Sequence, residues 1–507
     1  VLSSFLSISI LIAIHRLGQI TDYPFGVGWS EGNRLWDYSL YFRRDLYTIS
    51  GEFYYPTYLT PGRHGLWGLP FLFFSNPSIE LLRYWDALLW LIPYLVLGIV
   101  TFVLKRNSLT RTWGWIFALW TLLFLLQGPI YAPLVISALL IVVAYDREKP
   151  WRTIVITFIA CFYAGISRWT WMLAPAIWAG LWALLDEEED LEWTRRIRFT
   201  VILGVAGVAG ALAAQLFMNL AFPRPDTVYS TTLSQPLLWY RLWSSPTNPT
   251  GIVPGLLYAL GPLTLWLLWV IISRRLKWSA LQILGVTAAL LVFLGVGLAA
   301  SVKIGGGSNL HNMDMLLVTF VVLLGIIMIC EGVFRDMPGY AWALLALAAI
   351  IPIWNLMNFE VDQDLPTKED AKFALATVRA CVEQATEEGE VLFIDQRQLL
   401  TFGQIQDAPL VMDYELKHMM NQAMSGNREY FEAFERDLEE HRFILIVSDP
   451  LHIVYQGKEI PFGEENDLWV DAVTVPILEH YEPVLKLNDV DIWLLMPENE
   501  DGICVGM

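Results

Sequence analysis

Eleven apolar runs constrain the fold of this chain more than any other feature of its sequence. A helix needs about 20 apolar residues to cross a bilayer, and fewer where it is short and packed against others. Gly128-Pro129 and Ser167-Arg168 divide two longer stretches, because such pairs favour reversals. The sequence therefore predicts a polytopic α-helical membrane protein with spans at 1–16, 80–104, 112–127, 129–145, 153–167, 169–185, 199–220, 253–273, 279–300, 313–333 and 341–358.

Basic residues in alternate loops predict the orientation of these spans. Lysine and arginine are concentrated in the cytoplasmic loops of membrane proteins. With eleven spans, one side receives all the main basic groups, which lie near 105–111, 147–152, 195–198, 274–277 and 335. The extracytoplasmic side is then expected to hold 17–79, Arg168, 221–252, 301–312 and everything after about 359.

The chain changes character near residue 360. Residues 360–507 carry 32 Asp and Glu against 10 Lys and Arg, whereas the rest carries 19 against 23. Periodicity predicts helices and strands in alternation, with helices at 367–388 and 414–440, strands at 390–395 and 442–448, and a hairpin of 485–487 and 491–496. We expect two domains: a transmembrane domain over 1–358, with 17–79 as its first extracytoplasmic loop, and a soluble acidic α/β domain over 359–507.

The four cysteines show no metal-binding spacing. Cys161 and Cys330 lie in apolar runs, where a packing role is expected. Cys381 and Cys504 both fall in the soluble domain. They could form a disulfide if that domain is extracytoplasmic, although sequence separation alone does not decide this.

The first predicted loop carries an acidic and aromatic segment over 28–38. Glu31, Arg34 and Asp37 are spaced three apart, so a helix beginning at Glu31 would present them on one face. An amphipathic interfacial helix with ordinary ion pairs explains this pattern. A carboxylate at the membrane boundary can also activate an acceptor hydroxyl, or hold a divalent cation against a phosphate.

A second cluster lies between two predicted spans on the same side. In 301–314, three consecutive glycines would let backbone N–H groups approach an anion, Lys303 adds positive charge, and Asn309 and His311 can donate hydrogen bonds. A tight turn with a snorkelling lysine is the alternative. Arg168 is the only charge in a long apolar stretch, which suggests either phosphate binding or an interfacial arginine.

The order of these features resembles the first loop of GT-C glycosyltransferases, in the branch that includes protein O-mannosyltransferases and aminoarabinose transferases. Those enzymes have an Asp-Glu pair after the first helix, then an amphipathic helix, a Gly and Tyr/Pro segment, and a basic turn. Here the corresponding elements are Ser30-Glu31, 38–44, 51–56 and Pro61-Gly-Arg-His-Gly65, followed by the apolar 66–74. Because Ser30 replaces the first acid, only Glu31 matches as the catalytic carboxylate, and Asp37 is the fallback.

The resemblance implies a GT-C-like fold and an inverting transfer of a sugar from a polyprenyl-phosphate donor to a lipid, glycan or protein acceptor. Late loops of these enzymes supply a Lys or Arg to the donor phosphate, which points to Lys303. The other predicted phosphate-binding residues are Arg168, His311, Asn309, Arg63 and His64. All lie on the predicted extracytoplasmic face.

Two other functions fit parts of the sequence. A non-catalytic membrane subunit could use its acidic C-terminal domain to dock a protein partner. A transporter would usually have charged or broken helices at the membrane midplane, whereas the charges here sit mainly at helix ends. Nucleic acid is not an expected partner, because phosphate contacts need clustered Lys and Arg and the soluble domain is acidic.

Overall fold

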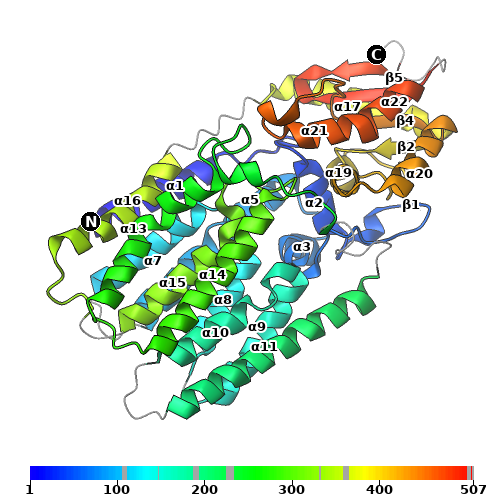
Figure 1. Cartoon of the computed structure of the whole chain (residues 1–507). Coiled ribbons are helices and arrows are strands. Elements are labelled where there is room, and N and C mark those ends of the chain that lie inside the picture. The colour runs from blue at the N-terminus through cyan, green and yellow to red at the C-terminus, as the bar shows by residue number, and fades with distance from the viewer. Residues whose placement is uncertain are drawn as a thin grey trace.

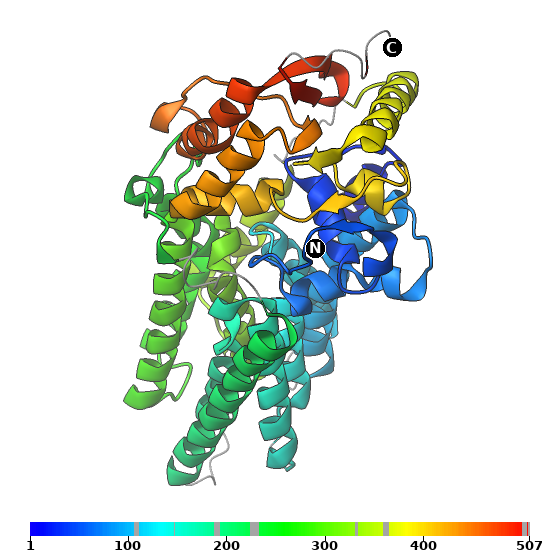
Figure 2. The same cartoon turned by 90° about the vertical axis from the view of Figure 1, so that its right-hand side faces the viewer.

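The computed structural model describes residues 1–105, 111–146, 148–186, 193–223, 233–329, 333–357, 365–498 and 504. A bundle of long helices forms one part, and a smaller α/β part covers one end of it (Figures 1 and 2). Helices are present at all eleven predicted spans. Within the described residues, seven helices are long and apolar enough to cross a membrane, as in a multi-pass membrane protein.

The bundle contains four shorter apolar helices beside the seven long ones. The long segments are Ile79–Leu104 (α5, Ile79–Leu89; α6, Ile92–Ile99; and a short π-helix, Val100–Leu104), α9 (Pro150–Ser167), α11 (Trp193–Ala221), α13 (Ile252–Ile272), α14 (Ala280–Val302), Leu310–Ile329 (containing α15, Asp314–Ile329) and α16 (Gly339–Met357). The shorter ones are α1 (Leu2–Gly18), α7 (Arg111–Leu126), α8 (Ala132–Ala144) and Trp169–Leu185, which contains α10 (Ala174–Leu185). The total of eleven spans stays a prediction.

Small residues bring the helices of the bundle into close contact. A Cβ added to Gly207 of α11 would lie 2.2 Å from the Cβ of Ala176 in α10, and one added to Gly210 would lie 2.3 Å from the Phe158 carbonyl in α9. Such glycines let membrane helices approach at the backbone. α15 is the central helix, with 94% of its most apolar window buried, against 22% for α14.

The basic loops gather at one end of the bundle. Lys105 donates to the Tyr145 carbonyl at 2.8 Å, and the Tyr145 hydroxyl donates to Asp186 at 2.8 Å. Arg275 donates to the carbonyl groups of residues 335 and 336. The α/β part covers the opposite end (Figure 1). This separation agrees with the predicted alternation of loops, while the side of the membrane on which each end lies stays a prediction.

The C-terminal α/β part is built around a four-stranded sheet in the order β2-β4-β6-β5. β2 (Glu390–Phe393) and β4 (Phe443–Ser448) are parallel, and β6 (Ile492–Pro497) is antiparallel to both β4 and β5 (Tyr481–Leu487). The helices are α17 (Lys368–Glu388), α18 (Gln398–Thr401), α19 (Leu416–Ser425), α20 (Arg428–Glu439), α21 (Gly463–Trp469) and α22 (Val475–His480). Cys381 and Cys504 form a disulfide, with their Cα atoms 5.1 Å apart.

The predicted strands and hairpin are confirmed, and so is the helix at 367–388. The helix predicted over 414–440 is instead two helices. Gly426 adopts a left-handed conformation (φ 68°) that ends α19, and the Asn427 side chain then caps α20 by accepting from the Tyr430 N–H. Sequence periodicity did not predict α21 and α22.

The first loop packs into the C-terminal part. Its strand β1 (Ile49–Ser50) pairs in parallel with β3 (Leu410–Val411). Its helix α2 (Glu31–Ser39) places Trp36, which is fully buried, beneath the Arg397 guanidinium at 4.6 Å from the ring centre. The same apolar core also takes first-loop side chains of Tyr23, Phe25, Leu40 and Leu59. Residues from both ends of the chain therefore share one core, and the predicted boundary at 358 stays a prediction.

Truncating this shared core should destabilise the whole molecule. We expect Trp36→Ala to cost about 3–5 kcal/mol, because it opens a cavity in a closed core. Thermal unfolding of the purified protein in detergent would measure the loss as a lower Tm. Trp354→Ala is the matched control, because that tryptophan is 59% exposed on α16. An equal loss in both variants would contradict the shared core.

Candidate functional site

Helix α2 lies between the C-terminal part and the membrane helices (Figures 1 and 2). It follows Ser30, whose φ of 51° is unusual for a residue other than glycine. Asn33 and Asp37, one turn apart, contact residues of the C-terminal part. Arg34 and Tyr38, also one turn apart, interact electrostatically with Asp86 and Tyr131, which belong to the membrane-helix part. One short helix therefore carries two functional faces.

Glu31 is held in a buried ion pair. Arg83 of α5 (Ile79–Leu89) donates to both carboxylate oxygens, each at 3.0 Å, and the Val27 N–H donates to one of them at 2.8 Å. Arg83 also donates to three carbonyl groups of the first loop, at residues 21, 23 and 25. The predicted catalytic carboxylate is thus firmly oriented, and its side chain remains 14% exposed.

Asp37 is fully buried against the C-terminal part. Lys417 forms an ion pair with it, and the Tyr58 hydroxyl donates to it at 3.0 Å. Burial raises the pKa of Asp37 to about 7; the nearby charge of Glu415 adds to the rise, while Lys417 opposes it. Asp37 is therefore a carboxylate that changes charge near neutral pH.

Positive side chains from three elements surround Tyr131, at the start of α8. The Arg63 guanidinium of α3 (Pro61–Trp67) lies 3.7 Å from the centre of the Tyr131 ring. The charges of Arg34 and Arg168 also act on the Tyr131 hydroxyl. Gly62 makes this convergence possible, because a Cβ there would lie 2.2 Å from the Ser167 hydroxyl at the end of α9. The close approach brings Arg63 beside Arg168.

Lys303 adds a further cation to this group, and the His311 ring lies beside it. Arg63 and Arg168 lie close enough to His311 for their charges to repel a proton on its ring. The charge of Arg168 likewise repels the charge of Lys303. His311 is fixed by a 2.8 Å hydrogen bond between its Nδ1 and the Asn309 side chain. Lys303 follows α14, and burial together with Arg168 lowers its pKa to about 8. We call Arg34, Arg63, Arg168 and Lys303 the cation cluster.

The cation cluster has few neutralising partners. Arg168 pairs with Asp314 at 3.5 Å and donates to the Asn312 side chain at 2.9 Å. Across the described part of the chain, Arg34, Arg63 and Lys303 form no ion pair within 4 Å, and the buried Nε of Arg63 has no hydrogen-bond partner. Uncompensated buried charge is costly. A multiply charged anion would offset this cost.

Two predicted features have other contacts in the structure. His64 is buried, and its Nδ1 accepts from the Thr60 N–H at 3.0 Å, which orients the start of α3. In the glycine loop, the Gly305 N–H donates at 2.7 Å to Glu465 of the C-terminal part. Arg241 donates to the same carboxylate at 2.7 and 2.8 Å. A protein carboxylate, and not a free anion, is bound at this point of the loop.

A metal site is not evident in the residues that the structure describes. None of their His, Cys, Asp and Glu side chains form a group of three that could hold a metal ion. The sequence left the need for a divalent cation open, and these residues supply no such ligand group.

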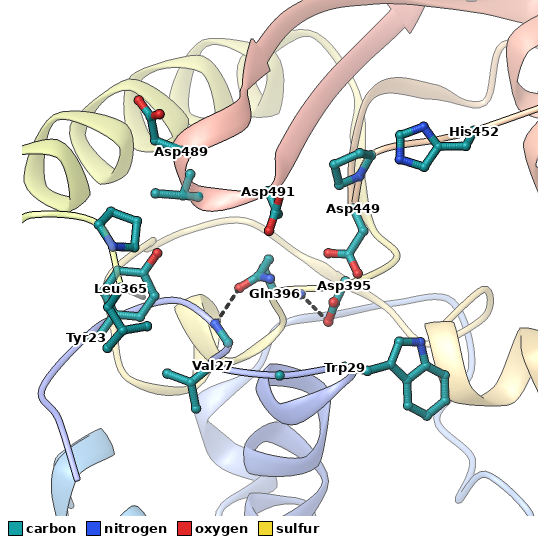
Figure 3. Close-up of a pocket in the computed structure, with 15 residues that line it drawn as sticks. Tyr23, Val27, Trp29, Leu365, Asp395, Gln396, Asp449, His452, Asp489 and Asp491 are labelled. Carbon is teal, nitrogen blue, oxygen red and sulfur yellow. Dashed lines mark hydrogen bonds between the residues drawn. The ribbon is translucent and has the colours of Figure 1, made fainter. Parts of the chain in front are cut away.

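A separate acidic cavity of about 550 Å³ lies between the first loop and the sheet (Figure 3). Asp395 and Asp449 follow the parallel strands β2 and β4, and share a hydrogen bond. Burial raises the pKa of both, and the charge of Asp395 raises that of Asp449 further. None of the eight predicted site residues lines this cavity. The only signal in the sequence was an Asp at the carboxyl end of each strand.

Sequence reasoning omitted Arg34, Tyr131 and Arg83 from the site. Arg34 was visible in the first loop, but its spacing from Glu31 suggested a simple ion pair. Glu31 pairs instead with Arg83, 52 positions further along the chain, and such a contact leaves no pattern in the sequence. Of the predicted residues, the structure gathers Arg63, Arg168, Lys303 and His311, with Asn309 as the hydrogen-bond partner of His311.

No family model and no curated protein matches this chain. Among solved structures, the chain is similar to the crystal structure of ArnT from Cupriavidus metallidurans in the apo state. The similarity covers 97% of each chain, with 11% sequence identity and a TM-score of 0.45. It concerns the course of the chain and not the residues of the cation cluster.

Removing one cation of the cluster should stabilise the protein. The pKa of Lys303 is about 8 in the folded protein against 10.5 ordinarily, so its charge disfavours folding below pH 8. We expect Lys303→Met to raise the Tm at pH 7. The gain should shrink as the pH rises from about 8 to about 10.5, because the lysine of the wild type then loses its proton. Thermal unfolding at several pH values would measure this, and a lower Tm at pH 7 would contradict it.

Proposed function

We propose that this protein transfers a sugar from a polyprenyl-phosphate donor to an extracytoplasmic acceptor. The observation that supports this most is the cation cluster, whose charges exceed its single ion-paired carboxylate, Asp314. Phosphate groups bind well to arginine, which offers several donors in a fixed geometry. The cluster lies among the ends of apolar helices, which favours an anion carried by a lipid over a soluble anion.

The position of the cluster favours a lipid-linked donor. Arg168 ends α9 and Lys303 ends α14, and both helices are long and apolar enough to cross a membrane. A phosphate held between these helix ends would sit at the level of lipid headgroups. The prenyl chain of the donor could then extend along the apolar helices. A soluble nucleotide-sugar has no such chain and would not need a site at this level.

The side chains suggest a direct displacement. In this reaction the bond between the anomeric carbon and the phosphate oxygen breaks as the bond to the acceptor oxygen forms. Arg34, Arg63 and Lys303 would stabilise the negative charge on the departing polyprenyl phosphate. Glu31 would accept the proton of the acceptor hydroxyl. Arg83 would orient Glu31 for this role, and the sugar would invert at its anomeric carbon.

Glu31 is the proposed base because it adjoins the cation cluster. Its charge acts on Arg34, which in turn lies near Tyr131. Asp37, the second predicted carboxylate, is on the other face of α2 and is fully buried. The acceptor class, whether lipid, glycan or protein, is left open by these contacts.

The acidic C-terminal part has contacts within the chain itself. Glu464 and Glu465 bind Arg241, at 3.0 and 2.7 Å, and Arg241 is 1% exposed. Glu415 and Lys417 contact the first loop. These contacts give the acidic domain a role in covering the cation cluster, so its acidity needs no separate protein partner as an explanation. A non-catalytic membrane subunit is therefore the second candidate function.

A transfer assay with polyprenyl-phosphate sugars tests the proposal. Glu31→Gln should lower kcat about 10²–10⁴-fold, because it removes a general base. Arg63→Met and Lys303→Met should each lower kcat/KM by about 10²-fold or more, because each removes a cation from the leaving phosphate. Native mass spectrometry would show weaker retention of polyprenyl phosphate in both.

Arg335→Met is the matched control, because that arginine is 85% exposed and lies with the basic loops at the far end of the bundle. It should transfer like the wild type. Unchanged transfer by Glu31→Gln would rule out Glu31 as the base. If the folded wild type transfers sugar from no polyprenyl-phosphate donor, the subunit function is favoured instead.

A further inference from the structure

The C-terminal part reaches α2 through a buried charged network. Lys417 pairs with Asp37, and its ammonium lies 4.5 Å from the centre of the Tyr58 ring. The neighbouring Glu415 accepts from Asn33 at 2.7 Å and from Tyr58 at 2.7 Å. We call Asn33, Asp37, Tyr58, Glu415 and Lys417 the α2 network.

The charges of the α2 network are buried or nearly so. Asp37 and Glu415 are fully buried, and the Lys417 side chain is 13% exposed. Such a pair adds little net stability, because desolvation opposes the attraction between the charges. Loss of one partner is nevertheless costly, since it leaves the other charge buried alone. The network therefore adds little to the free energy of folding, and its main effect is to fix one position of α2 against α19.

That placement also matters on the adjacent face of α2, which lies about 100° around the helix axis. Arg34 and Tyr38 each follow a network residue by one position, at Asn33 and Asp37. The charges of Arg34 and Arg63 both act on Tyr38, and Tyr38 packs against His64 with ring centres 6.0 Å apart. A rotation of α2 that moved Asp37 toward water would also turn Arg34 away from Tyr131.

We propose that Lys417 and Glu415 are positioning residues of the candidate donor site, which hold α2 so that Arg34 faces Tyr131 and the donor phosphate. The inference rests on the proposed function. It assigns the C-terminal part a direct role in the transfer site, and it makes Asp37 a structural partner of that part. Neither Lys417 nor Glu415 would touch the substrate.

The network gives this role a pH dependence. Burial raises the pKa of Asp37 to about 7, with Glu415 raising it further and Lys417 lowering it. The other groups that face Asp37 are Tyr58, which donates to it, and Tyr47, on which its charge acts. As the pH falls below about 7, Asp37 gains a proton and its attraction to Lys417 is lost. Donor binding should then weaken.

Two substitutions should move this dependence in opposite directions. Lys417→Met removes the charge that favours ionised Asp37, so the midpoint should shift to higher pH. Glu415→Gln removes a charge that opposes ionisation, so the midpoint should shift to lower pH. Lys417→Met should also raise the KM for the donor about tenfold or more, with a smaller change in kcat, because a displaced binding group loses much of its effect.

The experiment measures donor KM and kcat from pH 5.5 to 9 for the full-length wild type and variants. Lys486→Met is the matched control, because Lys486 lies over Trp493 of the sheet, away from α2. The double variant Asp37→Asn with Lys417→Met should recover part of the lost donor affinity, since no lone charge stays buried. A double variant with a higher donor KM than both single variants would overturn the inference.

Infrared spectroscopy separates this inference from the proposed function. The carboxyl band of Asp37, identified by its loss in Asp37→Asn, reports protonation without any substrate. If the wild type transfers no sugar, the proposed function fails whatever this band does. If transfer is present but the midpoint of the band is the same in the wild type, Lys417→Met and Glu415→Gln, the positioning role is overturned.

Discussion

The burial of α2 between two parts of the molecule is the constraint on which the rest of the structure depends. Its Trp36 lies in the core of the C-terminal part, while Arg34 faces the ends of the membrane helices. A helix of nine residues has little stability alone, so its position comes from these contacts. Moving it would disturb the sheet domain and the cation cluster together.

Buried charge is distributed unequally around this helix. Glu31, Asp37 and Glu465 each have a cationic partner, at Arg83, Lys417 and Arg241. Among the described residues, Arg168 alone in the cation cluster has a carboxylate within 4 Å, that of Asp314. Functional sites often keep such uncompensated groups at a cost in stability, because the ligand supplies the missing charge. The unpaired cations mark the candidate donor site, and pairing holds each carboxylate in one orientation, as Arg83 does for Glu31.

Much of the fold could be predicted from sequence, whereas the site could be predicted only in part. Hydrophobic runs predicted a helix at every proposed span, because membrane burial imposes a continuous apolar pattern. Lys303 and Arg168 stood out as charges beside such runs. The partners of Glu31 and Asp37 could not be recognised in the sequence, because Arg83 and Lys417 are 52 and 380 positions away from them. The break at Gly426 was also missed, because helical spacing continued on both sides of it.

The sequence by itself determined the helices of the bundle, the strands β2, β4 and β6 of the C-terminal sheet, and the set of charged residues available for chemistry. These follow from local periodicity and from the cost of placing charge in lipid. Only the tertiary structure decided which charges neutralise one another, that the first loop and the C-terminal part share a core, and which cations remain for an anion. Electrostatic pairing depends on distance in space, and contacts between distant segments leave no periodic pattern along the chain.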